Sequence, residues 1–168
     1  MTITTRPFRP DEWERFRDFR LAALQESPGL FFNPHAKEAA FPDGHWRSTL
    51  ENPGHQVFGV FEGEALIGLT AAFTDEGDPS GATALVAMGY VAPGHRGRGI
   101  SHLFHKATLD WIIGQPQFRR AVVSHRASNT ASRAGILAAG FVETARTGPW
   151  DWPDGTQDDD IAYEYLIP

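Results

Sequence analysis

The sequence predicts a single α/β (α+β) domain built on a mixed, mostly antiparallel sheet with a central β-α-β crossover and flanking helices. A buried strand runs into a glycine-rich turn, a helix and a second strand, which is the pattern of a parallel crossover. A hairpin precedes this unit and two strands follow its last helix, and short turns join antiparallel strands. A length of 168 residues suits one core, so we expect the domain to span residues 1–168.

The first fifty residues predict one strand and one long helix. Residues 3–8 read as a short strand, and Pro10 with the two acids after it indicates the start of a helix that ends near Pro28. The segment 30–52 is rich in Pro, His and Phe, and we expect a loop there with a short helix around residues 44–50. Loops of this kind often line substrate pockets.

The middle of the chain predicts the hairpin and the first half of the crossover. Residues 57–61 and 65–69 flank a Glu-Gly-Glu turn, which is a good hairpin signal. Residues 84–91 are apolar on both faces, as in a central strand. Apolar residues at helical spacing then run from residue 100 to residue 111.

The last third predicts a strand, a helix and two further strands. Residues 121–123 read as a short buried strand, and residues 129–139 as a helix that Gly140 ends. Residues 141–147 and 161–167 complete the sheet.

Composition narrows the function. Apolar residues make up 41% and charged residues 21%, the first residues lack the apolar segment of a signal peptide, and no apolar run is long enough for a bilayer. We therefore expect a cytoplasmic protein. The absence of cysteine excludes disulfides, thiolate metal sites and a thioester on the enzyme. The net charge is −6, yet residues 91–133 carry seven basic side chains and one acidic one. This segment indicates either a polyanion site or solvated arginines on helix faces, and the overall acidity argues against nucleic acid.

The turn at residues 96–101, Arg-Gly-Arg-Gly-Ile-Ser, leaves a strand and opens a helix. Glycines let a ligand approach the backbone, and the first N–H groups of a helix lack internal partners and favour anions. The turn therefore predicts a phosphate site, and the alternative is a tight turn without a ligand. The order of residues matches neither the dinucleotide fingerprint nor a P-loop.

The same turn resembles the pyrophosphate loop of the GNAT N-acetyltransferase family, in which Arg or Gln is followed at fixed spacing by Gly and then Gly or Ala. Arg96 and Gly99 match this pattern, and Ser101 replaces the last small residue. A second family signature, an asparagine with a small residue three positions on and Gly-Phe at the helix end, is matched by Asn129, Ser132, Gly140 and Phe141. The resemblance runs from about residue 57 to the C-terminus.

The resemblance implies acetyl-CoA as co-substrate, with its pyrophosphate on the turn and its pantetheine arm along the strand before it. A backbone N–H near Tyr90 would face the thioester oxygen, and Gly89 independently suggests a bulge or a close backbone approach. The CoA-binding residues implied are Met88, Tyr90, Val91, Arg96, Gly97, Arg98, Gly99, Ile100, Ser101, Asn129 and Ser132.

One departure from the family concerns the general acid. Many members carry a tyrosine seven residues after the asparagine, and Ile136 occupies that position. A carboxylate is the usual base for the amine, and the candidates are Glu26 and Glu164. Glu164 lies in an acidic C-terminal region whose alternative reading is a solvated loop. We expect His102 and His105 at the surface or beside phosphate, and no metal site.

These observations predict an acyltransferase that moves an acetyl group from acetyl-CoA to a primary amine of a small molecule, amino acid or peptide by direct attack. Two alternatives remain open: a longer acyl-CoA as donor, and a CoA-binding module without catalysis. As partners we expect the amine acceptor, no nucleic acid and no membrane. A homodimer is expected by analogy with the family.

Overall fold

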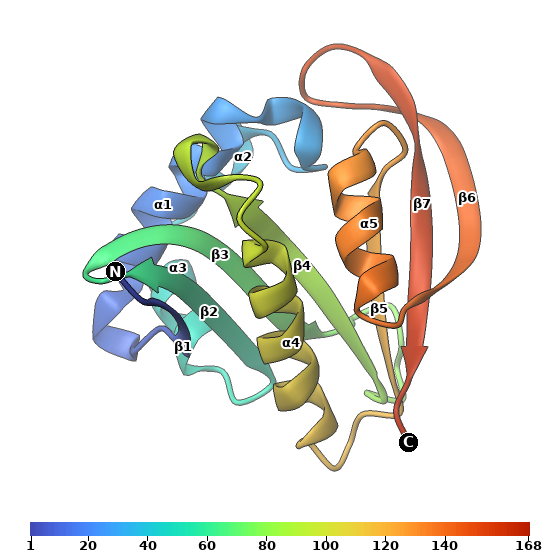
Figure 1. Cartoon of the computed structure of the whole chain (residues 1–168), viewed down its shortest axis with the longest axis horizontal. Coiled ribbons are helices and arrows are strands. Elements are labelled where there is room, and N and C mark those ends of the chain that lie inside the picture. Colours follow the sequence, from blue (N-terminus) through green and yellow to red (C-terminus); the bar gives the residue numbers. More distant parts are fainter.

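The computed structural model describes all residues, 1–168, and shows one seven-stranded sheet with helices on both faces (Figure 1). The strand order is β1-β2-β3-β4-β5-β7-β6, and only β4 and β5 run parallel. The predicted mixed sheet with its central crossover is confirmed. The strands are β1 (Ile3–Pro7), β2 (His55–Glu62), β3 (Ala65–Thr74), β4 (Thr83–Val91), β5 (Arg120–Arg126), β6 (Val142–Asp151) and β7 (Gln157–Leu166).

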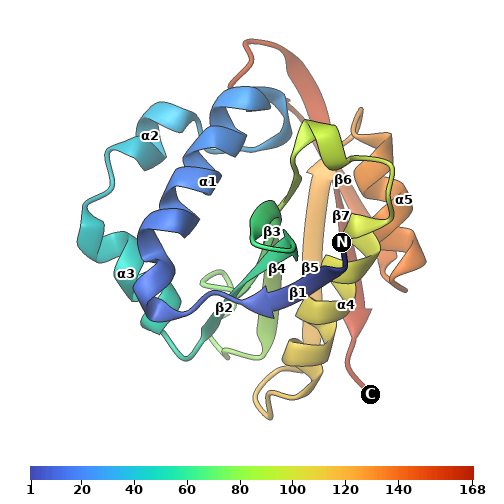
Figure 2. The ribbon, with the colours of Figure 1, turned by 60° about the vertical axis from the view of Figure 1, so that its left-hand side comes forward.

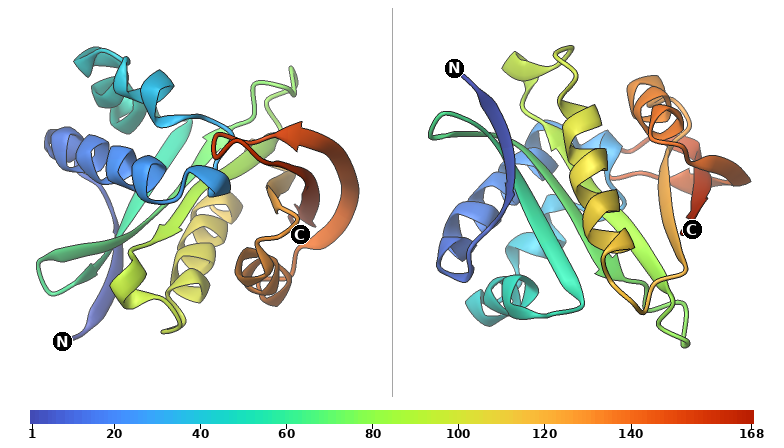
Figure 3. Two further views of the ribbon diagram at one scale, coloured as in Figure 1. Left: turned by 90° about the horizontal axis from the view of Figure 1, so that it is seen from above. Right: turned by 60° about the horizontal axis from the view of Figure 1, so that its bottom comes forward.

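The helices divide between the two faces of the sheet. One face carries α1, α2 and α3, and the other carries α4 and α5 (Figures 2 and 3). None of them is long and apolar enough to cross a membrane. The helices are α1 (Trp13–Glu26), α2 (His35–Ala39), α3 (Asp43–Glu51), α4 (Ile100–Ile113) and α5 (Thr130–Ala138).

Each face buries its own apolar cluster. Phe16 and Trp46 pack under α1 and α3, while Ile112, Phe118 and Tyr163 pack under α4 and α5. These five side chains are at most 2% exposed. Burying a large apolar side chain contributes about 1.5–3 kcal/mol to stability. The two clusters therefore hold the helices against both faces of the sheet. The place left for a ligand is a gap at the centre of the sheet.

That gap lies between β4 and β5. The two strands pair at three positions only, from Thr83 opposite Arg120 to Leu85 opposite Val122. Beyond Leu85 they separate towards their carboxyl ends, as Figure 1 shows. The crevice at the carboxyl ends of parallel strands is where α/β proteins place ligands.

A bulge in β4 faces this gap. The register against β3 shifts by one between Ala87 and Tyr90, so Met88 and Gly89 together lie opposite Thr70. Met88 has a φ of 62°, which is strained for a residue with a side chain. The bulge predicted from Gly89 is confirmed.

The segment after α1 contains more helix than predicted. It forms α2 as well as α3, where the sequence suggested mainly loop. Glu38 of α2 accepts hydrogen bonds from buried Arg20 of α1 at 2.8 and 2.9 Å. This long-range ion pair holds a five-residue helix that has no apolar periodicity of its own, since so short a helix is unstable alone.

Candidate active site

Three connected cavities follow the gap between β4 and β5. The turn cavity, about 290 Å³, lies beside the glycine turn. The middle cavity, about 110 Å³, shares Gly89 and Asn129 with it. The far cavity, about 360 Å³, shares Met88 and His125 with the middle cavity and lies against the α1–α2 connection and β7. The groove therefore passes from one face of the sheet to the other through the gap.

The turn cavity presents a row of free backbone donors. The N–H groups of the five consecutive residues from Gly97 to Ser101 have no acceptor within the protein. Gly97 and Gly99 hold φ angles of 75° and 73°, and a Cβ on either glycine would meet nothing within 4 Å. Because Gly99 caps the start of α4, these donors combine with the positive end of the helix dipole and favour a diphosphate.

The two arginines of the turn are already paired in this structure. Arg96 donates to the Val91 carbonyl at 2.9 Å and to Glu26 at 3.0 Å. Arg98 forms a two-pronged ion pair with Glu62 at 3.0 Å on each prong. Their charge is therefore largely balanced, and their direct effect is to fix the conformation of the turn.

Tyr90 contributes differently through its backbone and its side chain. Its hydroxyl donates to Glu26 at 2.8 Å, away from the middle cavity. Burial, together with that carboxylate, raises the pKa of Tyr90 to about 12, so the phenol stays protonated. Its backbone follows the bulge and borders the turn cavity.

Asn129 and Ser132 border both the turn cavity and the middle cavity. The Asn129 side chain accepts a hydrogen bond from the Ser132 N–H at 3.1 Å and so caps α5. The capped first turn of α5 borders the groove on the side opposite the glycine turn. The structure thus brings together the free donors at the start of α4, the capped start of α5 and the bulged strand.

The middle cavity has an apolar floor. Ile136 is fully buried and borders it, so no hydroxyl projects from that position. His105 also borders it, packs between Phe104 and Phe141, and is 5% exposed. Burial lowers its pKa to about 4, and the expectation of a surface or phosphate-side residue is wrong for His105. His102 is exposed, as expected.

The sequence did not predict the far cavity itself; it suggested only that the segment 30–52 could line a substrate pocket, and Phe31 and Phe32 of that segment do border this cavity. It also collects polar groups from four elements: the Arg20–Glu38 pair, Ser124, His125 and Asp160. Both ring nitrogens of His125 are engaged, with the Arg126 carbonyl at 2.6 Å and the Tyr163 hydroxyl at 2.8 Å. No pattern of local spacing links these residues, so sequence periodicity could not reveal the site.

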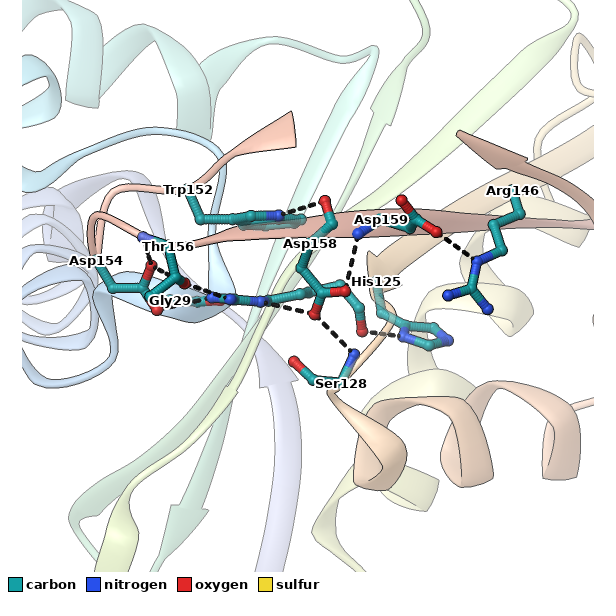
Figure 4. Close-up of polar contacts among 10 residues, drawn as sticks. Gly29, His125, Ser128, Arg146, Trp152, Asp154, Thr156, Asp158 and Asp159 are labelled. Atoms are coloured by element: carbon teal, nitrogen blue, oxygen red, sulfur yellow. Dashed lines mark hydrogen bonds and ion pairs between the residues drawn. The ribbon is translucent and has the colours of Figure 1, made fainter. Parts of the chain in front are cut away.

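Arg126 borders the far cavity, and its partners Gly29, Asp154 and Asp158 are labelled in Figure 4. Its guanidinium donates to Asp154 at 2.7 Å, to Asp158 at 3.0 Å and to the Gly29 carbonyl at 3.1 Å. It also lies over Trp152, 5.2 Å from the ring centre, and Trp152 stacks on Phe32. These contacts tie the β6–β7 loop to the turn after α1.

Glu164 lies elsewhere. It projects from β7 beside Val122, where β4 and β5 are still paired, and forms an ion pair with Arg120 at 3.5 Å. It borders none of the three cavities. The structure does not bring it together with the turn or the bulge. No three His, Asp or Glu side chains gather in a way that could hold a metal ion.

A sheet that separates between two parallel strands, with an anion cradle at a helix start and a bulge beside it, is suited to a transferase whose donor carries a diphosphate and an extended arm. A family model described as the acetyltransferase (GNAT) domain matches residues 2–142. The chain belongs to the GNAT acetyltransferase family. The predicted transferase class and acetyl-CoA co-substrate are confirmed at this level.

Solved structures share the fold. A GNAT-family acetyltransferase from Streptococcus pneumoniae superposes with a TM-score of 0.85 at 13% identity, over 99% of this chain and 100% of that one. A putative acetyltransferase from Salmonella typhimurium with its cofactor acetyl-CoA gives 0.79 at 16% identity, over 100% and 95%. Spermidine N-acetyltransferase from Vibrio cholerae, in complex with CoA and spermine, gives 0.76 at 16% identity, over 98% and 95%. A search of curated proteins gives no match.

Proposed function

We propose that this protein transfers the acetyl group of acetyl-CoA to a primary amine by direct attack. The observation that carries the proposal is the run of five unpartnered N–H groups at the start of α4, which opens onto the free edge of β4. The diphosphate would lie on these N–H groups, because a helix start that is free of side chains binds anions. The hydrogen bond of Arg96 to the Val91 carbonyl and the ion pair of Arg98 with Glu62 fix the conformation of the turn.

The pantetheine arm would lie along β4. Beyond Leu85 this strand has no partner on its β5 side, so its backbone groups are free to pair with an amide-bearing ligand as an added strand does. Met88, Tyr90 and Val91 supply this edge, and Asn129 and Ser132 face it from α5. The thioester would then reach the middle cavity beside the bulge, with a backbone N–H near Tyr90 as its oxyanion contact.

The middle cavity has room for a small acyl group. Its volume is about 110 Å³, with Val86 and Ile136 in its wall, and an acetyl group fits this space. The amine nitrogen forms the new C–N bond as the C–S bond breaks and the electron pair leaves with sulfur. Since a thiol has a pKa of about 8.5, the thiolate departs without a proton donor at position 136.

The test is acetyl-CoA binding by calorimetry, followed by free-thiol release with a panel of primary amines. We expect saturable binding and turnover with at least one amine. No heat at high micromolar acetyl-CoA would contradict the proposal, and so would a longer acyl-CoA that turns over faster.

A CoA-binding module without catalysis is the second candidate, and the aliphatic residue at position 136 favours it. Binding without thiol release across the whole panel would support the module. A homodimer stays a prediction.

A further inference from the structure

The far cavity contains one carboxylate without a basic partner. Glu38 and Asp160 are the two carboxylates that border the three cavities. Glu38 is neutralised by Arg20, with contacts of 2.8 and 2.9 Å, and both side chains are at most 6% exposed. Asp160 pairs with no arginine, lysine or histidine, and its Oδ1 is buried without a hydrogen bond.

The neighbouring acidic side chains in β7 and in the β6–β7 loop all form ion pairs within the protein. Asp154 and Asp158 bind Arg126, and Asp159 binds Arg146 at 2.7 Å. The guanidinium of Arg126 directs four of its five N–H groups to two carboxylates, a carbonyl and a hydroxyl, and it forms no ion pair with Asp160. Both ring nitrogens of nearby His125 are engaged with the Arg126 carbonyl and the Tyr163 hydroxyl. Asp160 therefore has no ion-pair partner within the protein, and an external cation can take that place.

The position of Asp160 suits an incoming amine. It lies opposite Arg126 in the β5–β7 ladder and borders the same cavity as Ser124 and Met88. Met88 and Ser124 also border the middle cavity, where the thioester would lie, so the two cavities meet between this carboxylate and the bulge. Burial raises the pKa of the Asp160 carboxyl, while hydrogen bonding with Ser124 and the nearby imidazole of His125 oppose that shift.

Most of the remaining wall is apolar. Besides Asn33, it consists of four aromatic and five aliphatic side chains, among them Phe31, Phe32, Phe73, Trp152, Leu85 and Met88. A volume of about 360 Å³ is in the range of small-molecule sites, which are mostly apolar with a few fixed polar groups. One unpaired negative charge can balance one ammonium group.

We propose that the far cavity is the acceptor site for a primary amine with a single positive charge and an apolar or aromatic body, and that Asp160 binds its ammonium group and accepts the proton released before attack. This inference rests on the proposed function. A polyamine carries further charges that this wall leaves without partners, and such charges are expensive to bury.

The protons balance in this scheme. The ammonium gives one proton to the Asp160 carboxylate, and the free amine then attacks the thioester carbon. A second proton passes to the departing thiolate, and the third remains on the amide nitrogen. Asp160 returns its proton to solvent when the amide product leaves.

The experiment compares Asp160→Asn with the matched control Asp159→Asn, using 2-phenylethylamine and spermidine as probes. Loss of a positioned base typically lowers the rate by about 10²–10⁴-fold. We expect kcat/KM for 2-phenylethylamine to fall at least about 100-fold in Asp160→Asn and to change less than about threefold in Asp159→Asn. Spermidine should be the poorer substrate of the wild-type protein.

Acetyl-CoA affinity and melting temperature separate this role from a structural one. Removing a half-buried charge without a partner should leave the melting temperature of Asp160→Asn unchanged or higher, with unchanged acetyl-CoA affinity. Equal turnover of 2-phenylethylamine by both variants overturns the inference while the proposed function stands, and so does a preference for spermidine. A wild-type protein that binds no acetyl-CoA overturns the proposed function itself.

Discussion

At the scale of single residues, a substitution at Gly99 tests the effect of backbone strain on ligand binding without adding a steric clash. Its φ of 73° is unfavourable for residues with a side chain by about 1–2 kcal/mol, although a Cβ there meets nothing within 4 Å. We predict that Gly99→Ala turns the N–H groups of the turn away from the ligand and raises the Kd of acetyl-CoA about tenfold. Calorimetry measures this change.

Gly94→Ala is the control for that substitution. Gly94 lies in the same connection, a Cβ there is equally unobstructed, and its φ is not positive. We expect its acetyl-CoA affinity to stay within a factor of about two. An equal loss in both variants would show that the left-handed backbone at Gly99 has no special part in binding.

His105 makes folding stability depend on pH. Burial lowers its pKa to about 4, against about 6.5 in the unfolded chain. The unfolded state therefore binds the proton first as pH falls, so the contribution is complete above about pH 6.5 and declines towards pH 4. We predict that the unfolding free energy falls by about 2 kcal/mol more between pH 7 and pH 5 in the wild type than in His105→Gln.

Urea unfolding at the two pH values measures that difference. Most of the shifted carboxylates have lowered pKa values and do not titrate appreciably in this window, so the histidine dominates the comparison. His55, whose pKa burial also lowers, remains in both proteins and cancels. Identical slopes would mean that His105 is not buried in its neutral form.

At the scale of elements, the close approach of two turns shapes the rim of the far cavity. A Cβ on Gly29 would collide with the Asp154 carboxylate and lie 2.8 Å from the Arg126 guanidinium. We predict that Gly29→Ala separates the turn after α1 from the β6–β7 loop. The KM for the amine should then rise severalfold and the melting temperature should fall, while acetyl-CoA affinity stays unchanged.

Gly44→Ala makes the same chemical change, but we expect it to have the opposite effect on the melting temperature. Gly44 lies within α3, and a Cβ there meets nothing within 4 Å. Alanine is favoured over glycine in a helix by up to about 1 kcal/mol, so the melting temperature should rise slightly. Kinetics with the amine and thermal melts of both variants provide the comparison, and a KM for Gly29→Ala equal to that of Gly44→Ala would refute the role given to the rim.

The elements also show where sequence patterns suffice. The strands β2, β3 and β4 were predicted because their apolar residues alternate or run continuously, and local physics sets both patterns. The short helix α2 was missed because it depends on the pairing of Glu38 with Arg20, eighteen residues away. A pair of opposite charges at that separation carries no local signal.

At the scale of the whole molecule, the groove shows the same contrast between features set by local sequence and features set by long-range contacts. The glycine turn lies in six consecutive residues, so its conformation between a strand and a helix could be predicted from the sequence. The far cavity combines α1, α2, β4, β5 and β7, whose side chains meet only after the sheet forms. Asp160 could be recognised only once the arginine partners of its three acidic neighbours were known.

The two parts of the sheet meet at a narrow seam, and this makes a last prediction. Three residue pairs join β4 to β5, while acetyl-CoA would lie between β4 with α4 on one side and α5 on the other. Binding should therefore slow amide hydrogen exchange at residues 97–101 and along the free edge of β4. It should also stabilise the fold by about 2.7 kcal/mol at one hundred times Kd.

Hydrogen exchange with and without acetyl-CoA tests that placement directly. Amides of α3 are the internal control, because this helix packs on the opposite face of the sheet and borders none of the three cavities. Slower exchange confined to α3, or to the exposed edge strand β6, would place the ligand away from the seam. Protection at residues 97–101 without protection along β4 would support a phosphate site but exclude a pantetheine arm that pairs with the strand.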